Sequence, residues 1–332
     1  MNGLYLPIGG SVERLSIILI FLLGFTSCVK KEPQEIREAI DEAQTFLSSG
    51  KCDAAIDVLE DVGRQTDDPI YLQVLASAYT CRAGFSEITF IDADLDRIET
   101  TTTDFMGSLT TLSSSQETVT ESLRYQDLRQ AINILLNVDE NQPSQVNRNA
   151  IFGNRKASDM AIQTIFLSLA QLGKFLKVYG NVDTNGAKGA GAGPNQCFIG
   201  YTYVQAQSYL NGTGNGGACD NIANDVGHPD LSLSTANLAT TRRRMCEGLM
   251  LVTNILDIMN SVNLPVNSSV DKLEDVIATV NEFKDFVVNT SPALETLLET
   301  TSQQTCETLT SSASEFDNLQ FVYALLFERG LP

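Results

Sequence analysis

Hydrophobic residues recur at spacings of three and four along most of the chain, which is the period of an amphipathic α-helix. Glycine and proline stand at the ends of several such segments, as at Gly50 and Pro69. The segments with this pattern are residues 35–49, 52–62, 69–81, 125–136, 159–179, 197–210, 238–259, 269–288 and 316–329. No two segments show the strict alternation typical of paired strands. The sequence therefore predicts an all-α fold.

Residues 159–179 differ from the other segments because they are apolar on almost every side. A helix that is hydrophobic all round belongs in a protein interior or in a membrane. Lys174, Lys177 and Ser168 make this one too polar for a membrane span. We expect it to be the central helix of the main body.

A polar stretch at residues 139–148 is the best candidate for an internal boundary. It divides the helical part into two expected regions. These are residues 35–138 and residues 149–332, the second carrying glycine-rich loops at 180–217. The first loop places Asn181, Asp183, Asn185 and Gly186 in the register of a calcium-binding loop. Ala192 occupies the position of the bidentate glutamate, so we expect a plain surface loop without a metal.

Residues 197–210 carry three tyrosines, Tyr201, Tyr203 and Tyr209, between two glycine-rich loops. Tyrosine offers a large contact area, and loops on a rigid scaffold often carry binding sites. We expect the region 180–230 to present these side chains to a partner. The alternative is that the tyrosines face the core and the loops only connect.

The N-terminus carries an apolar run of 11 residues, 15–25, which is too short to span a bilayer because a spanning helix needs about 20. Small residues and a cysteine follow, as Thr26, Ser27 and Cys28. Phe25-Thr26-Ser27-Cys28 resembles the lipobox of bacterial lipoproteins, with Phe25 where leucine is usual. An ordinary secretory signal is the alternative.

The lipobox resemblance implies that residues 1–27 are a signal peptide and residues 28–34 a tether. It implies a thioether-linked lipid on Cys28 as the membrane anchor, and no other cofactor is expected. Several acyl chains make such anchoring effectively permanent. Val29 follows the cysteine in place of the aspartate that favours inner-membrane retention in many bacteria, which implies the outer membrane.

Residues 35–85 resemble one and a half tetratricopeptide repeats. Gly50, Ala55, Leu59 and Pro69 fill the positions of the glycine that closes the first helix, two packed residues of the second helix and the proline before the next. The resemblance implies antiparallel helices and a concave surface suited to protein recognition. A generic helical hairpin is the alternative.

Six cysteines remain besides Cys28: Cys52, Cys81, Cys197, Cys219, Cys246 and Cys306. An even number in an exported protein indicates three disulfides, out of 15 possible connectivities. Antiparallel packing of the second and third helices would place Cys52 beside Cys81. Cys197 and Cys219 enclose one local segment, and Cys246 and Cys306 are what remains.

The net charge of −19 lies entirely on the mature body, which argues against nucleic-acid binding. Residues 242–244 are three consecutive arginines, which we interpret as a solvated helix face. His228 is the only histidine and lies in a turn-forming stretch, so we interpret it as a solvated loop residue. No nucleophile, metalloprotease or phosphate-binding motif is present. We therefore do not expect an enzyme, although one built on carboxylates alone is an alternative.

These observations favour a lipid-anchored helical scaffold that binds another protein of the cell envelope. The second hypothesis is a solute- or ligand-binding lipoprotein that assists an envelope transporter. A flat or grooved surface would favour the scaffold, and a buried pocket with converging polar groups would favour ligand binding.

Overall fold

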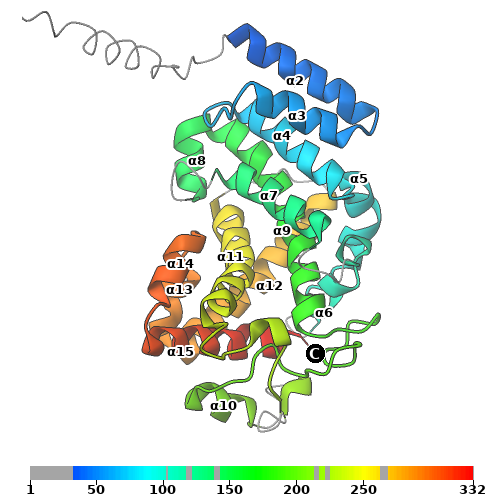
Figure 1. Ribbon diagram of the computed structural model, residues 1–332. Helices are drawn as coiled ribbons and strands as arrows, with labels where there is room; N and C mark the ends of the chain where they lie inside the picture. Colours follow the sequence, from blue (N-terminus) through cyan, green and yellow to red (C-terminus); the bar gives the residue numbers. More distant parts are fainter. Residues whose placement is uncertain are drawn as a thin grey trace, which may run out of the picture.

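The computed structural model describes residues 33–101, 104–116, 122–137, 143–212, 217–220, 225–261 and 268–331. Helices make up all the regular structure of these residues, and the only β-type pairing among them is an isolated bridge between Ile199 and Gly227. The prediction of an all-α fold is confirmed (Figure 1).

The first three described helices are α2 (Pro33–Ser48), α3 (Cys52–Asp61) and α4 (Pro69–Arg82), as predicted. Gly50 ends the first connection at a φ of 68°, a left-handed conformation that glycine adopts without strain. The carboxylate of Asp68 caps α4 by accepting the N–H groups of Ile70 and Tyr71. The Cys52–Cys81 disulfide joins the start of α3 to the end of α4, so these helices are antiparallel neighbours.

Helix α4 packs against α2, α3 and α7 (Leu123–Leu136), and it also touches α9 (Asn154–Tyr179). Helix α7 in turn packs against α9. In the order α2, α3, α4, α7, α9, each helix therefore packs against the next. Helix α4 also contacts both α2 and α9. Figure 1 shows this succession descending through the upper half of the molecule.

Helix α9 is the central helix that the sequence predicts. It packs against α6 (Phe105–Thr110), α7, α8 (Gln145–Phe152) and α11 (Leu238–Ser261). The contact with α6 requires a glycine, because a Cβ at Gly173 would lie 2.2 Å from the carbonyl oxygen of Leu109. Most of its residues are buried, including Lys174 and Lys177.

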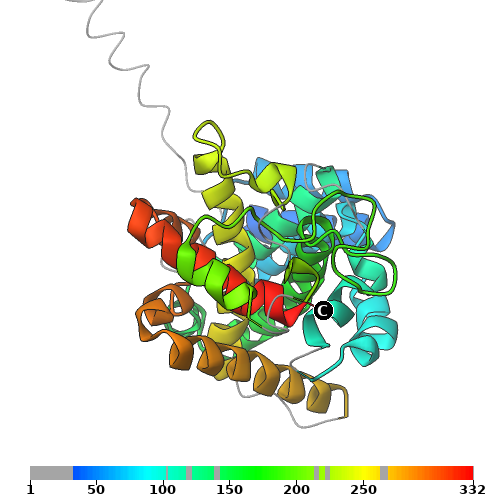
Figure 2. The ribbon, with the colours of Figure 1, turned by 90° about the horizontal axis from the view of Figure 1, so that it is seen from below.

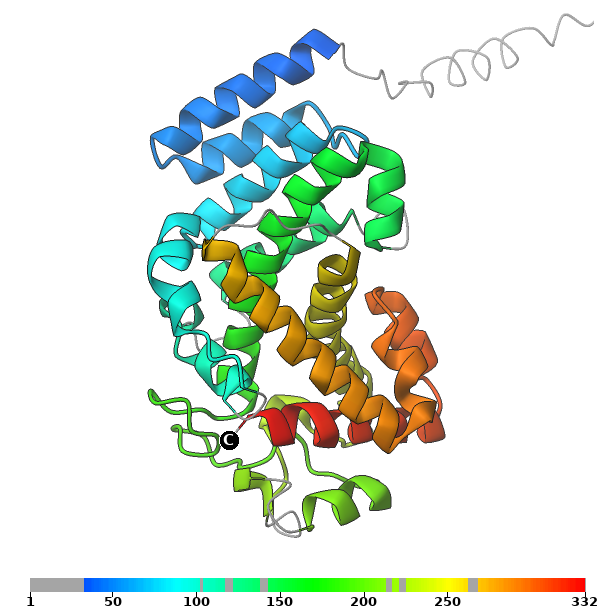
Figure 3. The same cartoon turned by 180° about the vertical axis from the view of Figure 1, so that it is seen from behind.

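The remaining helices close the lower half of the molecule around α11. They are α10 (Val204–Leu210), α12 (Ser268–Thr290), α13 (Glu295–Leu298), α14 (Gln303–Leu309), α15 (Ala313–Val322) and the π-helical turn η7 (Tyr323–Glu328). The Cys246–Cys306 disulfide joins α11 to α14. Figure 2 shows α15 and η7 crossing the lower end with α10 beside them, and Figure 3 shows α12 running diagonally across the back.

The polar stretch 139–148 does not separate two cores. Helix α8 begins at Gln145, whose side chain is buried, and the neutral amide oxygen of Gln145 accepts two N–H groups of the buried Arg148. The buried hydrophobic residues of the two expected regions, 35–138 and 149–332, form one continuous core from Ile40 to Leu331. The described end of this stretch, residues 144–148, therefore forms the N-cap and the first turn of α8 rather than a linker.

Several local predictions are wrong. Residues 197–203 are not helical, and only Val204–Leu210 of the predicted helix forms. Helix α15 begins with a capping box formed by Ser312 and Glu315, so it starts earlier than the expected residue 316. Helices α6 and α14 were not expected. Both are short, and tertiary packing rather than periodicity defines them.

The expected signal peptide and the lipidated Cys28 lie outside the described residues. Within the described ranges, no helix combines the length and the apolar character that a membrane span needs.

Candidate functional site

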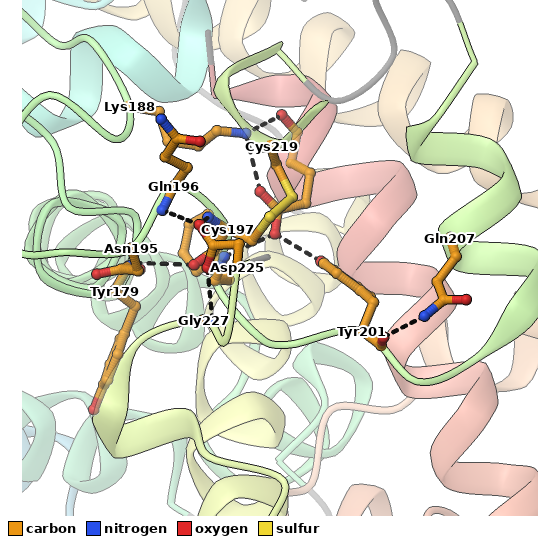
Figure 4. Close-up of a disulfide and its surroundings, with 12 residues drawn as sticks. Tyr179, Lys188, Asn195, Gln196, Cys197, Tyr201, Gln207, Cys219, Asp225 and Gly227 are labelled. Carbon is orange, nitrogen blue, oxygen red and sulfur yellow. Dashed lines mark hydrogen bonds and ion pairs between the residues drawn. A yellow bond between two sulfur atoms is a disulfide. The ribbon is translucent and has the colours of Figure 1, made fainter. Parts of the chain in front are cut away.

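The region expected to present a binding surface, residues 180–230, is held together from inside. The predicted Cys197–Cys219 disulfide is confirmed, with both cysteines fully buried. The carboxylate of Asp225 accepts the N–H groups of Gln196, Cys197 and Gly227 and so ties the two arms of the loop together. Figure 4 shows these residues converging beside the disulfide.

A buried carboxylate, Glu328, lies at the centre of this region. It accepts hydrogen bonds from the Tyr201 hydroxyl and the Phe198 N–H, each at 2.8 Å. Lys188 Nζ lies 2.9 Å from the same carboxylate and also donates to the Glu328 carbonyl. Both charged side chains are fully buried. Residues from two loops and the C-terminal turn therefore form a closed ion pair that is inaccessible to a partner.

Tyr201 is not part of an exposed surface, because its side chain is 4% exposed and burial raises the pKa of its hydroxyl well above 10. Tyr203 and Tyr209 are half-buried and both pack edge-on against Phe321 of α15. The expectation that all three tyrosines present contacts is therefore wrong for Tyr201. The Tyr201 hydroxyl donates to Glu328, which lies 127 residues further along the chain. A local sequence pattern therefore could not reveal this partner.

The glycine-rich loop uses its polar side chains to hold itself. The amide of Asn181 donates to the carbonyls of Gly193 and Asn195 and accepts the Gly193 N–H. The carboxylate of Asp183 accepts the N–H groups of Ala187 and Asn185, which lowers its pKa. These hydrogen bonds hold the loop in place, and the expectation that it binds no metal stays a prediction.

The arginine run is only partly a solvated face. Arg242 lies over the ring of Phe316, with 5.7 Å between its guanidinium carbon and the ring centroid, and Arg244 donates to the carbonyl of Asp230. Arg243 is exposed, as expected.

His228 is half-buried rather than fully solvated. It packs edge-on against Tyr179, and its Nδ1 accepts the Asp230 N–H. Burial lowers its pKa below 6.5.

An open groove lies at the other end of the molecule. It has a volume of about 970 Å³ and lies between α2, the turn before α4 and the first turn of α9. Its walls are Pro33, Ile36, Arg37, Ile40, Asp41, Gln44, Gln65, Asp67, Asp68, Pro69, Ile70 and Lys156.

A second hollow of about 390 Å³ continues this groove along α4 to α9 and shares Gln44 and Ile70 with it. Its other walls are Gln73, Val74, Ser77, Glu87, Asp159, Ile162, Gln163 and Phe166. We call the two hollows together the α2/α4/α9 groove.

The α2/α4/α9 groove is lined by both apolar and polar side chains. Ile70 is 46% exposed and lines both hollows, so it offers an apolar contact where they meet. Gln163 also lines the groove and donates to Ser77 Oγ and to Glu87 Oε1. Such a surface can bind apolar side chains while its amides and carboxylates orient a polar backbone.

Sequence reasoning missed this groove. It gave no role to Ile70, which lies at the start of the predicted helix 69–81. An isoleucine outside the packed face of a predicted helix was the available signal.

The chain matches no protein-family model, no curated protein and no solved structure.

Proposed function

We propose that this protein is a helical scaffold of the cell envelope that binds a segment of another protein in the α2/α4/α9 groove. The observation that carries the proposal is the groove itself, which is long, open and lined by helices that succeed one another in the packing order. Grooves of this kind suit an extended or helical peptide better than a small molecule, which needs enclosure.

The succession of helices supports a tetratricopeptide-like character for the N-terminal part. Helices α2 and α4 would be the first helices of consecutive pairs, with α3 and α7 as their partners. In helical repeats the concave face is the recognition surface. The groove occupies the side on which α2, α4 and α9 meet.

The walls of the groove also indicate the charge of the partner. Carboxylates outnumber cations among the lining residues, with Asp41, Asp67, Asp68, Asp159 and Glu87 against Arg37 and Lys156. The chain as a whole carries a net charge of −19. A partner segment that combines apolar and basic side chains is complementary to both features.

The lipid on Cys28 would hold this groove at a membrane surface. The first described helix, α2, begins at Pro33 and forms one wall of the groove. The tether between Cys28 and that wall is therefore only a few residues long, and the groove would face partners that lie at the envelope.

Site-specific photocrosslinking tests the proposal. A photoreactive residue at Gln44 or Gln73, on the groove walls, is expected to give the same discrete adduct in cells that make the protein. Val146 and Val226 are matched controls, because both are highly exposed apolar residues outside the groove. Adducts of equal yield from the control positions, or none from the groove positions, would contradict a groove-binding partner.

A further inference from the structure

A separate and more enclosed cavity lies on the other side of the helical succession. It has a volume of about 260 Å³ and opens between α7 and α11, with α9 below and the start of α14 at one side. This space equals the share of about nine water molecules in the liquid. No residue of the α2/α4/α9 groove lines it.

The cavity is lined by two arginines and one carboxylate. Arg129 lies 3.2 Å from Glu247, and Glu247 also accepts the hydroxyl of Tyr125 at 3.0 Å. Arg243 is exposed and forms no ion pair with any described residue. Since Glu247 balances Arg129, the lining keeps one uncompensated positive charge, in contrast to the acidic body.

The middle of the cavity is apolar. Its walls come from two helices and consist of Ile132, Leu136, Met250 and Leu251, each no more than 6% exposed. These side chains can cover the apolar body of a small ligand without rearrangement.

Two buried polar atoms belong to residues that line the cavity. Ser168 on α9 is fully buried, and its hydroxyl has no hydrogen-bond partner among the described residues. Asn254 on α11 is 3% exposed, and its Nδ2 donates to the carbonyls of Met250 and Thr301. Its Oδ1 accepts no hydrogen bond from any described residue. Leaving such buried groups without a hydrogen bond costs folding free energy. A ligand hydroxyl could donate to Asn254 Oδ1 and accept from the Ser168 hydroxyl.

We propose that this cavity binds a small organic acid with an apolar body and a distal hydroxyl. The carboxylate is placed at Arg243 and Arg129, the body lies between Ile132 and Met250, and the hydroxyl bonds Ser168 and Asn254. Arginine suits a carboxylate because its donors form a fixed fork. The site is independent of protein binding in the α2/α4/α9 groove.

Calorimetric titration of the full-length chain tests this proposal with four named probes. 4-Hydroxyphenylacetate and 6-hydroxyhexanoate carry all three features in two shapes. 4-Hydroxyphenylacetamide removes the charge, and phenylacetate removes the hydroxyl. We expect saturable binding of at least one hydroxy acid, at least tenfold weaker binding of the amide and measurably weaker binding of phenylacetate. No saturable binding of either hydroxy acid, or equal binding of acid and amide, overturns the proposal.

Substitutions of lining residues test whether the ligand binds in this cavity. Arg243→Gln changes an exposed side chain and is expected to lower the affinity for the hydroxy acid at least tenfold. Arg155→Gln, an exposed control on α9, is expected to leave this affinity unchanged. Ser168→Ala is expected to reduce binding of the hydroxy acid but not of phenylacetate. An unchanged affinity in Arg243→Gln overturns the proposed site. Inorganic phosphate that binds as tightly as the hydroxy acids would show a plain anion site and overturn the proposed ligand class.

Discussion

The pairing of Lys188 with Glu328 shows how much of the C-terminal half depends on single side chains. Each side chain is fully buried, and Glu328 also accepts Tyr201 and the Phe198 N–H. An ion pair taken out of water is costly to form but far more costly to break, because the remaining charge loses its partner.

Lys188→Met is therefore expected to destabilise the protein by about 3 kcal/mol, since it leaves the Glu328 carboxylate buried without its cation. Chemical denaturation of the two proteins measures this difference. Lys156→Met, which changes an exposed lysine, is the control and is expected to shift stability by no more than about 0.5 kcal/mol. A Lys188→Met variant as stable as the control would mean that the ion pair does not hold the loop.

His228 is the single histidine of the chain and reports the packing of its turn. Burial lowers its pKa below 6.5, Arg244 lowers it further and Asp230 opposes both. Between the folded pKa and 6.5 the unfolded chain binds more protons. The stability contributed by neutral His228 is therefore complete above pH 6.5 and is lost as the pH falls through the folded pKa.

A proton NMR titration observes this imidazole without overlap from other histidines. We expect a midpoint below 6.5. We also expect His228→Asn, whose side-chain oxygen can still accept the Asp230 N–H, to lose less stability than the parent between pH 7 and pH 5. A midpoint at or above 6.5 would show that the turn does not bury the ring.

At the level of the elements, the long helices could be predicted and the short ones could not. Helices α11 and α12 bury an apolar face over many turns, so each carries a periodic signal, and α9 is recognisable by its long, almost wholly apolar sequence. Residues 197–203 have a helix-like composition but are not helical, and Tyr201 and the Phe198 N–H donate to Glu328 instead. No window of local sequence contains that partner.

The candidate site, too, could be predicted only as far as local sequence determines it. The helices that form the groove were expected, but the groove depends on how far α2, α4 and α9 stand apart, which periodicity does not encode. The cysteine pairs could be predicted, because helix adjacency and a shared local segment indicate two of them and leave Cys246 and Cys306 as the third.

The two fully buried disulfides offer a matched test of what the cross-links contribute. Cys246–Cys306 closes a separation of 60 residues and Cys197–Cys219 one of 22, and all four cysteines are fully buried. In the chain-entropy account, the longer loop restricts the unfolded chain more. We expect Cys246→Ala/Cys306→Ala to cost about 1 kcal/mol more than Cys197→Ala/Cys219→Ala in urea denaturation. If removing Cys197–Cys219 cost more stability than removing Cys246–Cys306, the disulfides would act through packing in the folded state rather than through the unfolded chain.

At the scale of the whole molecule, one continuous core joins α2, α3 and α4 to the C-terminal helices. The groove is thus built on a rigid body rather than on an isolated hairpin. The lipid anchor on Cys28 stays a prediction. Cys28→Ala is expected to release the protein from the membrane fraction or to block processing, as cell fractionation measures. Normal processing with retention in the membrane would refute the anchor.

The central claim is that the α2/α4/α9 groove binds a segment of another protein, and Ile70 is its most direct probe. Ile70 is exposed where the two hollows of the groove meet. Replacing it with aspartate removes apolar contact and adds a charge without disturbing the core. The control is Val226→Asp, which changes a residue that is 80% exposed and lies outside the groove.

The decisive measurement is the dissociation constant of the partner recovered by crosslinking, for the parent chain and both variants. The account predicts that Ile70→Asp weakens binding at least about tenfold, which corresponds to the loss of one buried apolar side chain. It also predicts that Val226→Asp leaves binding within about twofold of the parent. Equal affinity of Ile70→Asp and the parent would contradict the account.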